Sequence, residues 1–157
     1  MAIITHARVK SRLAKMIDAP GGISVGVALA KAKANIEAKR AEAMTAVEVQ
    51  IAALESMVPP TNLEEQPDRL DEVYRAANAV IDAAGPFELL DLCNAASGLC
   101  DLIDGAPIDQ TFDWRIVTVH ARSLRLLQAL PVEETMARTT VLESLKMVAD
   151  RKLPSKA

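Results

Sequence analysis

Aromatic residues are nearly absent from this sequence: two Phe, one Tyr and one Trp make up 3% of its 157 residues. Its hydrophobic core therefore has to be built from Ala, Leu, Val, Ile and Met. Small side chains let helix axes approach closely, and Ala has the highest helix propensity. Because aromatic-rich runs are typical of strands, their scarcity argues against a sandwich or barrel. The sequence predicts an all-α fold.

The sequence also lacks an excess of one charge, because 18 Lys and Arg residues stand against 21 Asp and Glu, a formal net charge of -3. Such a balance provides no basic field for nucleic acid. The longest apolar run, residues 25–30, is far shorter than the ~20 residues that span a membrane. Residues 1–4 are too few for the apolar part of a signal peptide. We expect a soluble, cytoplasmic protein that binds neither nucleic acid nor membrane.

Only two cysteines are present, Cys93 and Cys100. Seven residues of helix separate them by about 10 Å, whereas a disulfide needs Cα atoms within about 7 Å. We expect two reduced thiols that pack as small hydrophobic groups, since metal sites use closer cysteine spacing. No HExxH, Walker, GxSxG or paired Glu-x-x-His motif occurs. The sequence thus indicates no catalytic residue, metal or cofactor, and it predicts a non-enzymatic protein.

What the sequence does contain is a long alanine-rich stretch, residues 24–58, with apolar positions that recur every eleven residues. Such a repeat corresponds to about 3.67 residues per turn, so we expect one nearly straight helix of about 35 residues. Ser24 is its expected N-cap, and Pro59-Pro60 is its expected end. The apolar stripe consists of Val25, Leu29, Ala32, Ile36, Arg40, Ala43, Val47, Ile51, Leu54 and Val58. Arg40 is the only break in this stripe.

A helix of this length needs a long partner surface. The stripe should be buried, above all at Ile36, Val47, Ile51 and Leu54. The positions expected to be exposed are Lys31, Lys39, Glu42 and Glu48. In a monomer one end of the stripe would extend beyond the neighbouring helices and expose apolar surface. The sequence therefore predicts a homodimer.

Other segments predict further helices, bounded by Gly and Pro residues and by short polar connections. The expected ranges are a short basic helix at 3–17 and amphipathic helices at 70–84, 86–104, 114–130 and 132–152. Short connections should make the later helices pack antiparallel in a bundle. The expected organisation is a basic N-terminal segment (1–22), a single helical-bundle domain (23–153) that includes the long helix, and a frayed tail (154–157).

His120 is the one histidine in an expected core helix, and it is the strongest chemical candidate. Imidazole nitrogen is nucleophilic near neutral pH, and Arg115, Arg122 or Arg125 could steady a phosphate. A histidine on a helical bundle with cations nearby is typical of phosphorelay transfer domains. Those domains usually carry Lys-Gly after the phosphoacceptor, whereas here Leu124 occupies the comparable place.

The neighbours of His120 on its own helix favour burial rather than exposure. Val117, Ala121 and Leu124 make that helix face apolar. We expect the ring to pack against adjacent helices with its nitrogens satisfied internally. A histidine phosphotransfer domain that uses His120 is therefore kept as the alternative function.

The run Ser11-Arg-Leu-Ala-Lys-Met-Ile-Asp-Ala-Pro-Gly-Gly22, followed by residues 25–29 and 34–37, resembles the N-terminal part of small CheE-type accessory proteins encoded beside bacterial chemotaxis genes. It covers about the first quarter of the chain and holds no catalytic motif. The resemblance implies a signalling context and assigns no site residue. The leading expectation is a helical protein-interaction or regulatory module in bacterial chemotaxis or two-component signalling, with an unidentified protein partner.

Overall fold

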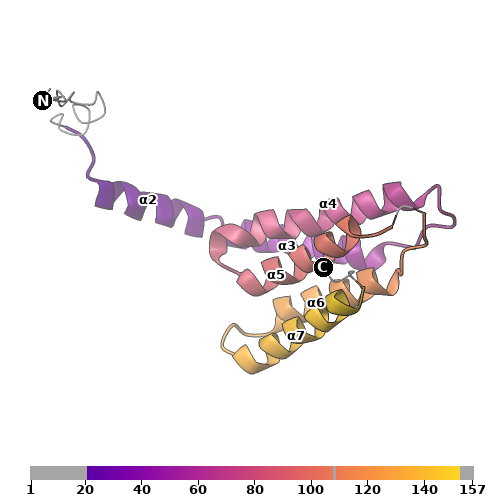
Figure 1. The fold of residues 1–157 in the computed structure, drawn as a ribbon. Helices are drawn as coiled ribbons and strands as arrows, with labels where there is room; N and C mark the ends of the chain where they lie inside the picture. Colours follow the sequence, from indigo (N-terminus) through magenta and orange to yellow (C-terminus); the bar gives the residue numbers. More distant parts are fainter. Residues whose placement is uncertain (1–20, 108, 153–157) are drawn as a thin grey trace, which may run out of the picture. The chain divides into compact units, whose positions relative to one another are not determined.

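The computed structural model describes residues 21–107 and 109–152, and every regular element among them is a helix (Figure 1). The all-α prediction is therefore confirmed for the described residues. The expected basic helix at 3–17 and the expected tail at 154–157 lie outside them. The elements are α2 (Val25–Glu37), α3 (Arg40–Ser56), α4 (Gln66–Ala84), the short 3-10 helix η1 (Gly85–Phe87), α5 (Leu90–Asp104), α6 (Arg115–Ala129) and α7 (Thr135–Lys152).

The predicted continuous helix over residues 24–58 is wrong, because a turn at Ala38 and Lys39 separates α2 from α3. At this turn the Lys39 N–H bonds to the Ile36 carbonyl, three residues back, at 2.9 Å. The longest helix is α4, with 19 residues. The predicted ends are better matched, since the Ser24 hydroxyl accepts the Val27 N–H at 3.4 Å and α3 stops at Ser56, before the two prolines.

The turn lies next to Arg40, the one polar residue in the apolar stripe. Its guanidinium bonds to the Glu37 carboxylate at 2.6 Å and lies over the Phe87 ring, 4.9 Å from the centroid. Beyond Arg40 the stripe is buried at Val47, Ile51 and Leu54, as predicted. Before it the stripe is exposed, and Ile36, which was expected to be buried, is 45% exposed. The stripe therefore lacks the continuous packing that would hold two segments in one helix.

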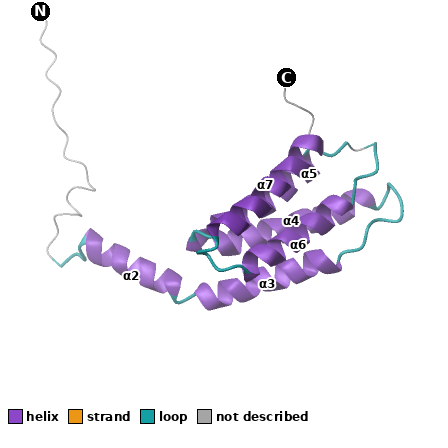
Figure 2. Ribbon diagram, turned by 90° about the horizontal axis from the view of Figure 1, so that it is seen from below, coloured by secondary structure: helices purple, strands orange, loops and turns teal. Residues whose placement is uncertain are grey.

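The chain forms two compact units, which divide between Asn35 and Ile36. In the larger unit, α3, α4, α5 and α6 form a ring in which each helix packs against the next and α6 packs against α3. The last helix, α7, packs against α5 and α6. Successive helices of this unit run in alternating directions, as the short connections predicted (Figure 2).

The core of this unit is aliphatic and lies where the helices face one another. Its largest fully buried side chains are Val47, Ile51, Leu54, Val73, Val80, Leu99, Val117, His120, Leu124 and Leu127. All four positions expected to be exposed, Lys31, Lys39, Glu42 and Glu48, are exposed. No helix among residues 21–107 and 109–152 is long and apolar enough to cross a membrane.

Several helix boundaries differ from those expected, each for a local reason. Helix α5 begins at Leu90 rather than Pro86, because η1 intervenes and Glu88 adopts a left-handed conformation with a φ of 57°. Helix α7 begins at Thr135 rather than Val132, since the Thr135 N–H bonds back to Glu133 in a tight turn. Glu133 and Glu134 therefore precede the helix.

Candidate functional site

His120 lies in the middle of α6, on the face that looks into the bundle. The residue is 1% exposed, so its predicted burial is confirmed. Its Nδ1 lies 2.8 Å from the carbonyl oxygen of Ile116, one turn earlier on the same helix. Because a carbonyl can only accept, Nδ1 carries the hydrogen and Nε2 is left with a free lone pair. Burial lowers the pKa of His120, which keeps the ring neutral at pH 7.

The second ring nitrogen faces a glycine on the neighbouring helix. A Cβ placed on Gly98 of α5 would lie 3.8 Å from Nε2. Among the described residues none donates a hydrogen bond to Nε2, so only half of the predicted internal satisfaction is present. Every side-chain nitrogen or oxygen of the described residues that is sealed from open space has a hydrogen-bond partner. Nε2 has no such partner, so it is not sealed. It follows that Nε2 touches the cavity beside it.

This cavity, of about 390 Å³, opens between α5, α6 and α7 and has a graded lining. His120, Ala95 and Leu145 are the buried part, and Leu142 and Ala149 form half-buried apolar walls. The outer part is polar and exposed, with Asn94, Ser97, Asp101 and Lys146. Asp101 and Lys146 form no ion pair with each other or with another described residue.

The three arginines expected near His120 do not line this cavity. Arg125 binds the Glu55 carboxylate of α3 at 2.8 Å, and Arg115 binds Asp113 at 2.8 Å. Arg122 is exposed. The cation that does line the cavity is Lys146 of α7, which sequence reasoning missed. No periodicity within one helix could have found it, because three helices bring these residues together.

A larger hollow of about 450 Å³ lies between the start of α4 and the end of α5. Its buried polar side chain, Gln66, is already used: its Nε2 donates to the Gln110 carbonyl at 2.9 Å, and its Oε1 accepts the Phe112 N–H at 2.7 Å. This amide ties the loop before α6 to the start of α4. Both hydrogen-bonding atoms of this buried amide therefore have partners, whereas His120 Nε2 has none among the described residues.

The two cysteines are free thiols, as predicted. Cys100 is buried and Cys93 is half-buried. Burial raises the pKa of Cys100 to about 11, with the nearby carboxylates of Asp104 and Asp101 as further causes. A thiol with such a pKa stays protonated at pH 7 and is a poor nucleophile. Among the described residues no three His, Cys, Asp or Glu side chains converge as a metal site requires.

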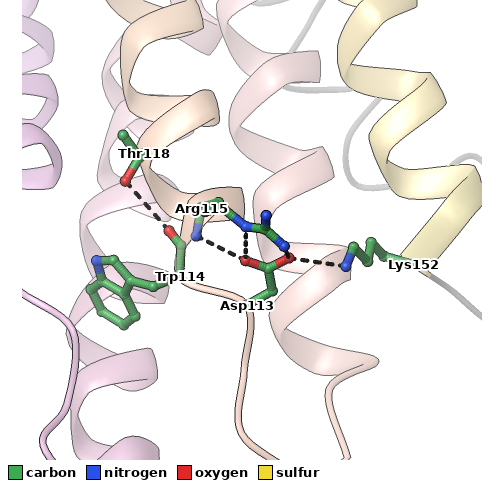
Figure 3. Close-up of polar contacts among 5 residues, drawn as sticks. All are labelled: Asp113, Trp114, Arg115, Thr118 and Lys152. Atoms are coloured by element: carbon green, nitrogen blue, oxygen red, sulfur yellow. Dashed lines mark hydrogen bonds and ion pairs between the residues drawn. The ribbon is translucent and has the colours of Figure 1, made fainter.

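A polar cluster joins the start of α6 to the end of α7 (Figure 3). The Asp113 carboxylate accepts hydrogen bonds from the Arg115 guanidinium at 2.8 Å and from the Lys152 ammonium at 3.0 Å. It also accepts the backbone N–H of Arg115, the first residue of α6, at 3.2 Å. These hydrogen bonds, that from the Arg115 side chain foremost, hold the pKa of Asp113 well below its usual range.

Asp113→Asn is expected to lower stability at pH 7 by about 1 kcal/mol, a modest loss because both cations are partly exposed to solvent. A pKa depressed by folding contributes stability above the unfolded value of about 3.9, and this is lost as the pH falls below that value. Urea unfolding of both proteins should therefore show a difference at pH 7 that shrinks towards pH 2. At pH 7 the control Asp150→Asn, at an exposed site on α7, should change stability by less than about 0.5 kcal/mol. A pH-independent difference for Asp113→Asn would contradict the role of the charge.

Comparison with models of protein families, with curated proteins and with solved structures finds no match to this chain. Function therefore has to be argued from the molecule itself.

Proposed function

We propose that this chain is a non-enzymatic helical interaction module that forms a homodimer through the apolar face of α2. The observation that carries the proposal is that α2 buries none of its residues. Val25, Leu29, Ala32 and Ile36 recur at intervals of three or four, so they lie on one side of the helix. All four are exposed, with Leu29 at 57%. We call this surface the α2 face.

The composition of the α2 face favours a second copy of the same helix as its partner. It consists of aliphatic side chains of medium and small size, and Ala32 permits close approach of helix axes. A two-fold interface uses the same patch on both subunits, so a patch without net charge can pair with itself. A helix of 13 residues is marginal in water by itself. Packing against a second α2 would stabilise it.

The proposed context is bacterial chemotaxis or two-component signalling in the cytoplasm, which the N-terminal resemblance favours. Most of that run, residues 11–20, lies outside the described residues. Phosphotransfer by His120 has less support. A response regulator has to reach the imidazole ring directly, whereas His120 is 1% exposed, and Arg115 and Arg125 bind carboxylates.

Leu29→Glu is expected to abolish the dimer. A carboxylate in the centre of the α2 face would lose its hydration on pairing without gaining a partner. Val27→Glu is the matched control, because Val27 is 48% exposed but lies on the opposite side of α2. Light scattering at micromolar concentration should give a dimer mass for the wild type and for Val27→Glu, and a monomer mass for Leu29→Glu. A monomeric wild type, or equal effects of both substitutions, would reject the proposal.

A further inference from the structure

The cavity beside His120 has the features of a small-molecule site. Its volume of about 390 Å³ is in the range of ligand pockets, roughly 300–1,000 Å³. Ligand pockets combine apolar walls with a few placed polar atoms. Here Ala95, Leu142, Leu145 and Ala149 are the apolar walls, and His120 Nε2 is the polar atom of the buried end. All lining residues belong to α5, α6 and α7, so the site is independent of the proposed dimer.

The chemistry of Nε2 restricts what this site can recognise. The Ile116 carbonyl holds the hydrogen on Nδ1, which leaves Nε2 as a hydrogen-bond acceptor. A buried acceptor favours a ligand that donates an O–H or N–H, because a ligand without a donor leaves the acceptor desolvated and unpaired. Ligand discrimination should therefore depend on a donor group, and not on shape alone.

The charged residues of the outer part favour neither sign of ligand charge. Asp101 and Lys146 carry opposite charges and lie on the same rim, so their fields oppose each other. The rim therefore offers no net attraction to an anion or to a cation. Ser97 and Asn94 add neutral hydrogen-bonding groups at the opening. A neutral ligand needs no such attraction.

Gly98 gives access to the nitrogen. A Cβ at this position would be in ordinary contact with Nε2, at 3.8 Å, so any longer side chain would extend into the space in front of the ring. A glycine inside a helix costs about 1 kcal/mol relative to alanine. The open space it leaves is where a ligand could meet the nitrogen.

We propose that the cavity between α5, α6 and α7 binds a small, neutral, largely apolar alcohol or phenol, whose hydroxyl donates to His120 Nε2. The hydroxyl lies at the buried end of the cavity. The hydrocarbon part contacts Leu142, Leu145 and Ala149, and the rim residues close the entrance.

Phenol and fluorobenzene test the proposal on the full chain, because they have similar shapes and only phenol has a donor. Titrations followed by NMR should show that phenol shifts the His120 Nε2 resonance and the amides of Ala95 and Gly98. Fluorobenzene should bind at least tenfold more weakly. Equal affinities, or no change in the His120 resonance at millimolar phenol, would overturn the proposal.

Gly98→Leu should abolish phenol binding, since its side chain would fill the space in front of Nε2. The matched control is Gly85→Leu, at a helical glycine with open space around it, and it should bind phenol as the wild type does. Phenol binding that survives in a folded Gly98→Leu protein would place the ligand elsewhere and overturn the proposal. If Gly98→Leu does not fold, the comparison of phenol with fluorobenzene on the wild type decides.

Discussion

Val47→Asp should lower the free energy of unfolding by about 4 kcal/mol, a large part of the roughly 5–15 kcal/mol that holds a domain folded. Val47 is fully buried on α3, at a point where this helix packs between α4 and α6. The substitution removes apolar contacts worth about 1.5–3 kcal/mol and places a carboxyl group without a partner in an aliphatic environment. The measurement is urea unfolding at pH 7 followed by circular dichroism.

Val49→Asp is the matched control, because it makes the same change two residues away on the same helix at a side chain that is 56% exposed. Its effect should stay within about 0.5 kcal/mol. Burial would raise the pKa of the carboxyl group that Val47→Asp introduces, so the cost of ionisation begins above the unfolded pKa of about 3.9 and grows until the pH exceeds the raised pKa of the folded protein. The two variants should therefore converge as the pH is lowered. Equal stabilities at pH 7 would show that Val47 does not face a dry core.

The pattern of apolar residues was sufficient to predict the second half of the long stretch. Positions Val47, Ile51 and Leu54 are separated by three and four residues, and they are buried because α4 and α6 cover that side of α3. The first half has the same pattern without the same burial. Periodicity shows which side of a helix is apolar, but it does not show whether another element covers it. Arg40 was the available signal, since this charged residue in the stripe directly follows the turn.

The burial of His120 could be predicted from local sequence, whereas the cavity beside it could not. Its burial could be predicted because Val117, Ala121 and Leu124 share its side of α6. The cavity could not, since Gly98 comes from α5 and Lys146 from α7. Such a site depends on the packing of three helices. A glycine in a helix indicates a close approach or an opening, but only the packed structure shows which group it faces.

Arg138 is a buried arginine that the sequence did not mark. The residue is 5% exposed, near the start of α7. Its Nε donates to the Asp91 carboxylate at the start of α5, at 2.6 Å. Its Nη1 donates to the carbonyls of Leu127 and Leu130 at the end of α6, at 2.7 and 2.9 Å. Carbonyls at the end of a helix have no donor within the helix and carry partial negative charge. A buried guanidinium supplies both the missing donors and a positive charge.

Arg138→Met should lower the free energy of unfolding by about 3–5 kcal/mol, because it leaves a carboxylate and two carbonyls without their donor. The free energy of unfolding of Arg138→Lys should lie between those of the wild type and Arg138→Met. An ammonium keeps the charge, but it cannot reproduce three hydrogen bonds whose directions are fixed by the planar guanidinium. The control Arg151→Met, at an exposed site on the same helix, should change stability by less than about 0.5 kcal/mol. Thermal and urea unfolding of the three variants measure these differences in stability.

A double-mutant cycle with Asp91→Ala separates the ion pair from the carbonyl contacts. If the pair matters, Arg138→Met should cost less in the Asp91→Ala protein than in the wild type, with a coupling energy of about 1–3 kcal/mol. The destabilisation by Arg138→Met that remains in the Asp91→Ala protein is due to the lost hydrogen bonds to the Leu127 and Leu130 carbonyls, which do not involve Asp91. Arg138 would then hold α5, α6 and α7 together by two separable sets of bonds. A coupling energy near zero, with Arg138→Met no worse than Arg151→Met, would contradict this role.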